Sequence, residues 1–151
     1  MVPEIANATR TLIINNVSTT NGGTAAGYVD TLGADYVSIS VHLPTADVVS
    51  NTPSVLRILE SDATQPTAPT NYATFSGFVS GTDYTIPNAI TAATSITKPF
   101  AVFNLRTNAR KRYIRLEVSP RTTQIVTADA VVLRQQATPS TSAGATLVVN
   151  G

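Results

Sequence analysis

The sequence predicts an all-β protein, an antiparallel β-sandwich of about eight strands that is jelly-roll-like. Three observations indicate this class. Apolar and polar residues alternate with a period of two in several short runs. Clusters of Gly, Pro, Asn, Asp and Ser separate these runs, as turns do between strands. No run combines the length and the 3.6-residue period of a long helix.

Length and composition suit one domain with two irregular ends. The chain has 151 residues, enough to bury a core without metal ions or disulfides. We expect an N-terminal arm at residues 1–10, a β-sandwich domain at 11–136 and a flexible C-terminal tail at 137–151. Only 13% of the residues are charged, so partners are expected to cover part of the surface.

The net charge and the missing cysteines exclude several classes of protein. A formal charge of +1 gives no global case for nucleic acid or a membrane as a partner. Without cysteine, disulfides and thiolate metal sites are impossible. The N-terminus lacks the pattern of a signal peptide, and no apolar stretch approaches the ~20 residues of a membrane span. We therefore expect a soluble protein made in the cytoplasm.

The first predicted strands lie in the N-terminal third. Residues 11–15 are a short β-prone run, followed by a turn-rich loop at 15–27. Residues 36–43 show the cleanest alternation. One face carries Val37, Ile39, Val41 and Leu43, and the other carries Tyr36, Ser38, Ser40 and His42. Pro44 ends this run because proline cannot donate a hydrogen bond to a strand ladder.

The middle of the chain predicts two more strands and two weaker segments. Residues 54–60 are apolar on both faces, and at seven residues a strand is favoured over a helix. Residues 72–79 alternate again after a loop rich in Pro and Thr. Residues 84–87 form a short extended piece, and the Ala- and Thr-rich run at 88–98 has room for one helical turn.

Residues 100–118 predict a hairpin of two half-buried strands that forms the centre of the sandwich. Ala101, Phe103 and Leu105 share one face of the first strand. Ile114, Leu116 and Val118 share one face of the second. A long strand at 124–135 follows, and the β-prone run at 146–149 is suited to add to a sheet edge.

Half of the positive charge falls on this hairpin, which makes it the candidate interaction site. The five residues, of ten Lys and Arg in all, are Arg106, Arg110, Lys111, Arg112 and Arg115. One interpretation is a docking site for an acidic protein surface. A second is a solvated tip whose charges pair with acids such as Glu117. A third is nucleic-acid binding, which the near-neutral net charge and the lack of an interleaved aromatic platform disfavour. Strand alternation puts Arg112 and Arg115 on opposite faces, so we expect Arg110 and Lys111 at the tip to meet the partner.

No motif in the sequence indicates catalysis, a cofactor or a metal site. His42 is the only histidine, there is no G-x-S-x-G elbow, and neither phosphate-binding glycine motif occurs. His42 is expected to be a surface or interface residue. The aromatic residues Tyr36, Tyr72, Phe78 and Tyr113 are either ordinary cover for the sandwich or a surface that stacks on sugars or a partner. No enzyme activity is expected.

Three strings of residues resemble capsid decoration (cement) proteins of tailed bacteriophages. They are DYVSI from Asp35, LESD from Leu59 and RKRY from Arg110, within a similar region of residues 30–135. The resemblance implies a β-sandwich or jelly-roll unit, usually a homotrimer, seated on the outside of the capsid. No catalytic residues come with it.

We therefore expect a virion structural protein that binds the major capsid protein and itself. Bridging several capsid subunits would stabilise the head, and extended ends could add strands to neighbours. The alternative is a carbohydrate- or receptor-binding β-sandwich of a phage tail or fibre. An enzyme is a distant third.

Overall fold

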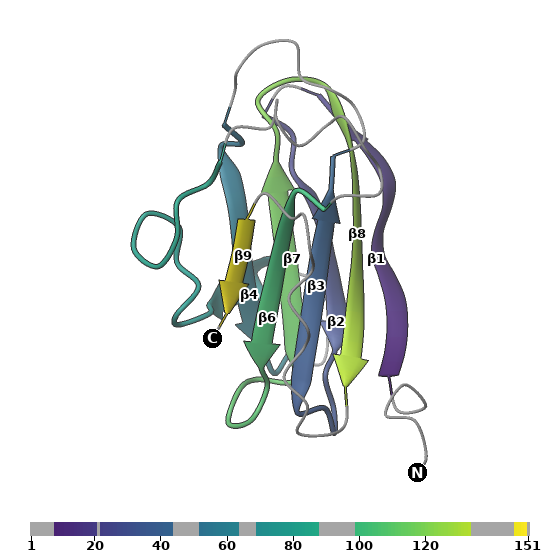
Figure 1. The fold of residues 1–151 in the computed structure, drawn as a ribbon, viewed down its shortest axis with the longest axis vertical. Coiled ribbons are helices and arrows are strands. Elements are labelled where there is room, and N and C mark those ends of the chain that lie inside the picture. The colour runs from purple at the N-terminus through teal and green to yellow at the C-terminus, as the bar shows by residue number, and fades with distance from the viewer. Residues whose placement is uncertain are drawn as a thin grey trace.

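The computed structural model describes residues 8–20, 22–43, 52–63, 69–87, 99–133 and 147–150. These residues form nine strands and no α-helix, arranged in two sheets (Figure 1). The strands are β1 (Ala8–Thr19), β2 (Ala25–Asp30), β3 (Tyr36–His42), β4 (Val55–Ser61), β5 (Ala73–Thr74), β6 (Ala101–Arg106), β7 (Tyr113–Ser119), β8 (Gln124–Leu133) and β9 (Leu147–Asn150). A 3-10 turn, η2 (Pro69–Asn71), precedes β5. The predicted all-β sandwich is confirmed.

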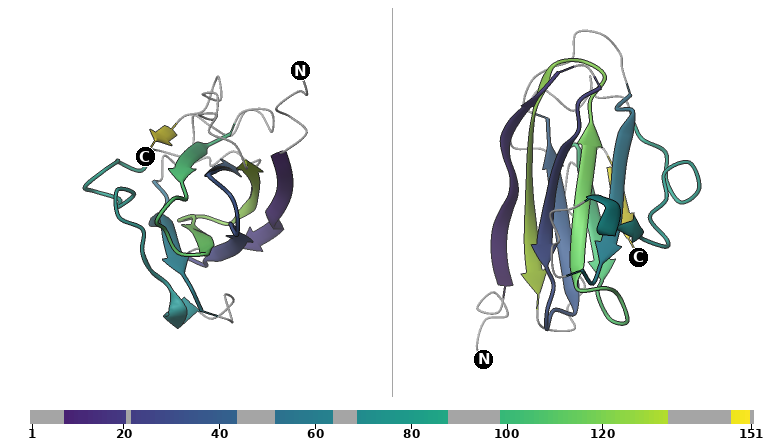
Figure 2. Two further views of the ribbon diagram at one scale, coloured as in Figure 1. Left: turned by 90° about the horizontal axis from the view of Figure 1, so that it is seen from below. Right: turned by 180° about the vertical axis from the view of Figure 1, so that it is seen from behind.

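The strand order follows from the way the chain pairs with itself. β1 pairs with β8, β2 with β7, β3 with β6 and β4 with β5, always antiparallel. This is a double-stranded ribbon, and wrapping it around a core brings β3 beside β8 and β4 beside β7. The resulting orders, β1-β8-β3-β6 and β2-β7-β4-β5, are those of a jelly roll. β9 extends the first sheet as a parallel neighbour of β6. Figure 2 shows the curved sheets from below.

The core lies between the two sheets because alternation points one face of each strand inward. The residues predicted to face inward are all buried: Val37, Ile39, Val41, Leu43, Ala101, Phe103, Leu105, Ile114, Leu116 and Val118. Four phenylalanines fill the largest volumes, each at most 1% exposed: Phe75, Phe78, Phe100 and Phe103. Phe75 and Phe78 meet edge to face, with ring centroids 5.3 Å apart.

The prediction of one hairpin at residues 100–118 is wrong. β6 lies between β3 and β9 in the five-stranded sheet, whereas β7 lies between β2 and β4 in the other. The connection at residues 107–112 crosses between the sheets at the lower end of the sandwich (Figure 1). Alternation determines which face of a strand is apolar, but it does not identify the neighbouring strand. Both strands direct that face into the same core, from opposite sides.

Near the N-terminus, the strands differ from the sequence expectation. β1 begins at Ala8 and runs to Thr19, so residues 8–10 belong to a strand rather than to the arm. β2 was missed altogether, because Ala25-Ala26-Gly27 has low intrinsic β-propensity. Antiparallel pairing with β7 holds β2 in the extended conformation that its own residues favour only weakly.

Further along, the predicted strand at 72–79 shrinks to the two residues of β5. Gly77 has a φ of 87°, and the Phe78 N–H donates to the Phe75 carbonyl at 3.2 Å, which closes a turn. The edge strand expected at 146–149 is confirmed as β9, one residue later. The expectations for residues 1–7, 88–98 and 134–146 lie outside the described residues.

β1 and β2 bring the two sheets together along one side of the sandwich. They belong to different sheets, yet a Cβ added to Gly27 would lie 2.0 Å from the Ile13 carbonyl oxygen. Only a glycine permits this approach. Beside it is an open groove of about 400 Å³, lined by Leu12, Ile13, Ala26, Gly27, Tyr28 and Arg115. β1 forms the outer edge of the molecule in both side views (Figures 1 and 2).

Candidate functional site

The predicted basic cluster is divided between the two sheets. Arg106 ends β6, where its Nε donates to the Tyr36 hydroxyl at 3.1 Å and its guanidinium lies over the Tyr36 ring. The other four residues, at 110–115, belong to β7 or to the loop before it. The crossing between sheets therefore separates Arg106 from the rest.

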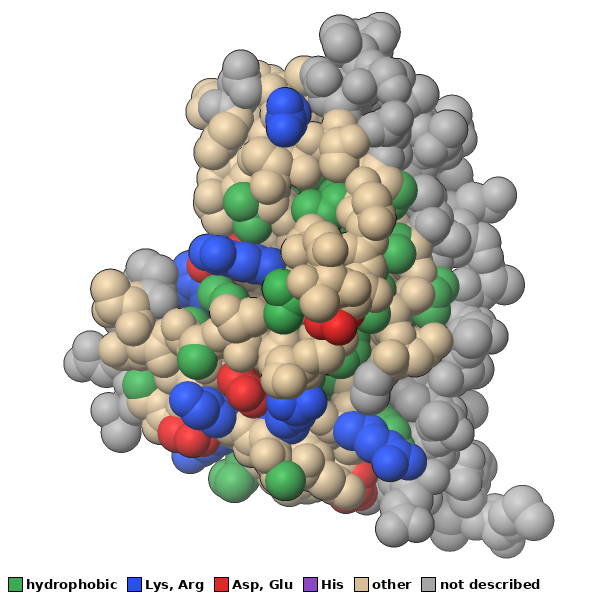
Figure 3. Space-filling model, turned by 90° about the vertical axis from the view of Figure 1, so that its left-hand side faces the viewer, with side chains coloured by type: hydrophobic (Ala, Val, Ile, Leu, Met, Phe, Trp, Pro, Cys, Tyr) green, Lys and Arg blue, Asp and Glu red, His purple; other side chains and the backbone are tan. Residues whose placement is uncertain are grey.

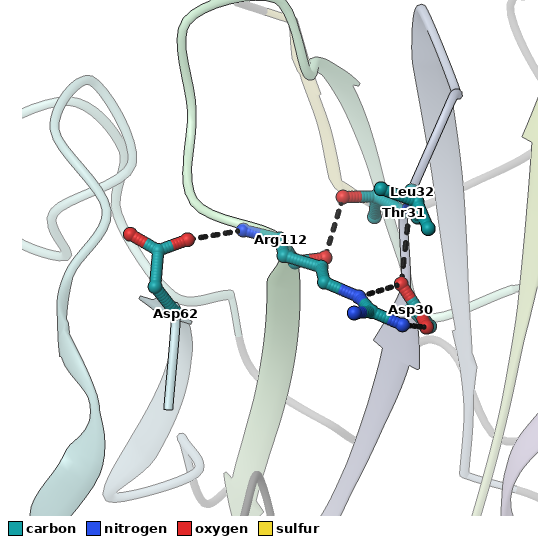
Figure 4. A network of polar contacts seen from close by, with 5 residues as sticks. All are labelled: Asp30, Thr31, Leu32, Asp62 and Arg112. Atoms are coloured by element: carbon teal, nitrogen blue, oxygen red, sulfur yellow. Dashed lines mark hydrogen bonds and ion pairs between the residues drawn. The ribbon is translucent and has the colours of Figure 1, made fainter. Parts of the chain in front are cut away.

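Arg112 lies in a network that ties three strands together (Figure 4). Its guanidinium binds both carboxylate oxygens of Asp30, at 2.9 and 2.6 Å. The backbone N–H of Arg112 donates to Asp62 at 2.9 Å, and its carbonyl accepts from Thr31. The hydrogen bond from Arg112 lowers the pKa of Asp30 below its ordinary value. The Arg112 guanidinium is therefore already bonded to a carboxylate of the same chain.

The tip of the connection is also held by internal contacts. The Arg110 guanidinium lies 4.2 Å from the centre of the Phe75 ring and donates to the Ser76 carbonyl at 2.9 Å. The backbone N–H of Lys111 donates to Glu60 at 3.2 Å. Among the described residues, nothing bonds to the Lys111 ammonium group. Of the five basic residues, Lys111 is therefore the one that best fits a solvated cation.

The Arg115 side chain is largely enclosed, at 12% exposure. It faces outward on β7, and its Nε donates to Glu117 at 2.9 Å. The other oxygen of Glu117 binds Arg57 of β4 at 2.6 Å. On the face shown in Figure 3, acidic and basic side chains adjoin one another instead of forming one positive patch. Of the five residues, Arg112 and Arg115 pair with acids, Asp30 and Glu117.

Three tyrosines surround Arg115 on the outer face of the β2-β7-β4-β5 sheet; we call them the tyrosine cluster. Tyr28 of β2 lies opposite Arg115, and its ring meets Tyr113 edge to face at 6.1 Å. The Arg115 guanidinium lies 5.4 Å from the centre of the Tyr72 ring. Burial raises the pKa of Tyr72 to about 12, so its hydroxyl stays protonated.

The cluster differs from the aromatic set that the sequence suggested. Tyr72 and Tyr113 belong to it, but Tyr36 is 8% and Phe78 1% exposed, so neither is a surface ring. Tyr28 was missed because β2 was missed. The alternation of Ala26, Tyr28 and Asp30 with Gly27 and Val29 is the signal that could have revealed it. Arg112 also joins this face, since its guanidinium lies over the Tyr113 ring. The expectation that Arg112 and Arg115 point to opposite faces is therefore wrong, because Arg112 precedes β7 and folds over its end.

The exposed large apolar side chains of the described residues belong to strands along one side of the sandwich. They are Leu12 at 51%, Val17 at 39%, Tyr28 at 38%, Leu32 at 65% and Ile125 at 38% exposure. All five belong to β1, to β2 and the turn after it, or to β8, which pairs with β1. We call this set the apolar edge.

His42 is more buried than a surface residue, with its side chain 19% exposed. Its Nε2 lies 3.6 Å from Asp129, which also accepts a hydrogen bond from Arg10 at 3.0 Å. Burial raises the pKa of Asp129, but the bonds from His42 and Arg10 outweigh it and leave the pKa below its ordinary value. No described residue bonds to His42 Nδ1, so no nucleophile is in place there. The three residues connect β3, β8 and β1.

The described residues contain no group of three or more His, Cys, Asp or Glu placed to hold a metal ion. Their structure includes no helix long and apolar enough to cross a bilayer. No protein-family model matches this chain, and no curated protein matches it in sequence.

Proposed function

We propose that this chain is a capsid decoration protein of a tailed bacteriophage, which binds the outer surface of the head and bridges capsid subunits. The observation that carries the proposal is the apolar edge. Large exposed apolar groups that gather on one side mark a surface that a protein partner covers. The jelly roll, which is common in viral capsid proteins, and the resemblance of residues 30–135 are consistent with this role.

The charged residues support docking through the apolar edge rather than through the basic loop. Arg110, Arg112 and Arg115 are already bonded within the chain, so an acidic partner would have to displace those bonds. Exposed ion pairs contribute little to stability, and their exchange contributes little to binding. Burying Leu12 and Val17 removes apolar surface from water without breaking an internal bond. The major capsid protein is the proposed partner, and a homotrimer would present three such edges at once.

The test is cosedimentation with undecorated capsids, followed by the temperature at which the shells rupture. We expect saturable binding and a higher rupture temperature. The double variant Leu12→Asp, Val17→Asp should lose binding, whereas Thr85→Asp, an exposed position away from the edge, should bind as the wild type does. Lys111→Glu should also bind normally. A chain that never cosediments, or one that loses binding through Lys111→Glu alone, would refute this docking surface.

The other expected function, recognition of a carbohydrate or receptor, has separate support. The tyrosine cluster lies on the outer face of the β2-β7-β4-β5 sheet and would pack against such a ligand. A ligand at this place would leave Val17 and Ile125 of the apolar edge uncovered.

A further inference from the structure

We propose that the partner at the apolar edge binds as an extended segment, which adds a fifth strand to the four-stranded sheet beside Tyr28 and Asp30 of β2. The inference rests on the proposed function, because it takes the capsid protein as the partner. It goes further by naming the mode of binding, which combines main-chain hydrogen bonds with apolar contacts. The segment is uncharged and extended, and it carries apolar side chains on one face.

The first support is the direction of the main-chain groups of β2. β2 is the first strand of its sheet, and its one neighbour in the sheet is β7. The Thr31 N–H donates to the Arg112 carbonyl at 2.9 Å, so the main chain of Thr31 points toward β7. Because these groups alternate along a strand, those of Val29 also point toward β7, and those of Tyr28 and Asp30 point away. No strand of the described residues pairs with that side, which we call the free edge. It offers two N–H donors and two carbonyl acceptors.

The second support is the surroundings of the free edge. The groove of about 400 Å³ lies between β2 and β1, with Leu12 and Tyr28 among the residues that line it. The contact of Gly27 with the Ile13 carbonyl closes one part of β2, so a new strand is confined to the half after Gly27. That half is open to solvent, since Tyr28 is 38% exposed and Asp30 is exposed as well.

The third support is that β1 lacks cover on both of its faces. Of its 12 residues, only Ile14 and Thr19 are buried. Thr11 lies opposite Ala130 of the core, which puts Thr11 on the inner face of its sheet, yet it is exposed. A strand added to β2 would continue the second sheet past β2 and lie against this part of β1. It would also cover Leu12, which is 51% exposed.

The charges around the free edge favour an uncharged segment. Both oxygens of the Asp30 carboxylate are bound by Arg112 (Figure 4). A charged segment would have to compete with this ion pair, whereas main-chain pairing leaves it intact. Leu32, in the turn after β2, is 65% exposed and continues the apolar surface of Leu12 and Tyr28 along the edge. Apolar side chains of the segment would remove these groups from water.

The first test is amide hydrogen exchange of the full chain, free and bound to undecorated capsids. In the free chain, the N–H groups of Tyr28 and Asp30 should exchange at least tenfold faster than those of Val29 and Thr31, which face β7. On the capsid, the exchange of the same two groups should slow at least tenfold. If it stays fast while the chain is bound, strand addition is refuted and the docking surface of the proposed function stands. A wild-type chain that never cosediments overturns both.

A proline variant isolates the main-chain contribution. Tyr28→Pro and Tyr28→Ala both remove the ring, but only Tyr28→Pro removes the N–H, and proline is tolerated where that group faces away from the neighbouring strand. We expect Tyr28→Pro to bind capsids at least tenfold more weakly than Tyr28→Ala, with the fold checked by circular dichroism. Equal binding of the two would overturn the proposal. If Tyr28→Pro does not fold, the exchange rates decide.

The matched control is Val148→Pro in β9, at the edge of the other sheet. The Leu147 N–H donates to the Phe100 carbonyl, so the N–H of Val148 points away from β6. Val148→Pro therefore removes an outward N–H far along the chain from β2, and it should bind capsids as the wild type does. A loss of binding equal to that of Tyr28→Pro would refute the assignment to β2.

Discussion

Replacing Gly27 by Ala tests how tightly β1 closes over β2. The added Cβ would lie 2.0 Å from the Ile13 carbonyl oxygen, whereas ordinary contact begins at 3.4 Å. β1 would have to move away by about 1.4 Å, the difference between these distances. Neither the added Cβ nor the Ile13 carbonyl oxygen can rotate aside, because the backbone fixes the position of each. We expect a loss of about 3 kcal/mol, the upper end of the range for overpacking, and a fall in melting temperature of roughly 6–12 °C for a chain of this size.

Urea denaturation followed by far-UV circular dichroism measures this loss. The matched control is Gly33→Ala, where a Cβ would meet nothing within 4 Å but the φ of 73° is unfavourable for alanine. Its cost should be only about 1 kcal/mol. Gly27 has no positive φ, so its sensitivity would come from the contact alone. If Gly27→Ala proves no more costly than Gly33→Ala, the two strands do not approach as the structure shows.

Three further variants test the interior and its charges. Asp129→Asn should flatten the pH dependence of the urea midpoint. The pKa of Asp129 is lowered in the folded state, so this carboxylate stabilises the fold above about pH 4, and that stabilisation is lost as the pH falls through the folded pKa. Midpoint curves that run parallel for the variant and the wild type would contradict this. Glu117→Gln should lower the free energy of unfolding by about 2–3 kcal/mol, less than for a fully buried ion pair because Arg57 is half exposed. If the variant is as stable in urea as the wild type, the ion pair makes no net contribution to stability. Phe103→Ala should cost about 4 kcal/mol by cavity formation, and a calorimetric loss below 2 kcal/mol would mean that the core collapses around it.

The sequence was a sufficient guide to the core because burial and alternation are local properties. Val37, Ile39 and Val41 could be assigned to one face without knowing which strand lies beside them. Pairing is not local. The strand that ends at Arg106 and the one that begins at Tyr113 are close in sequence, and a hairpin was the simplest expectation for them. They fall in different sheets because of the pairing of all eight strands of the ribbon, and a short stretch of sequence carries no information about that pairing.

The candidate site was harder to predict for the same reason. The cluster of Arg residues was visible in the sequence, and Glu117 could be named as a partner, but Asp30 and Arg57 could not. Asp30 meets Arg112 across 82 positions, and Arg57 meets Glu117 across 60. Only the pairing of β2 and β4 with β7 reveals that Arg112 and Arg115 already have acidic partners. Tyr28 was overlooked because glycine and alanine around it hide a strand.

The pairing of β1 with β8 has a consequence for how the protein is made. Ala8 lies opposite Leu133, 125 positions later in the chain. At the ~5–20 residues per second of translation, β1 waits about 6–25 s before its partner exists. During that time it is an unpaired strand edge, open to association with other chains. Long-range pairing of this kind also slows folding itself. Slower translation lengthens this exposure, so yield should fall as synthesis slows. A chain cut short before residue 124 would lack both β8 and β9 and would leave β1 without its partner.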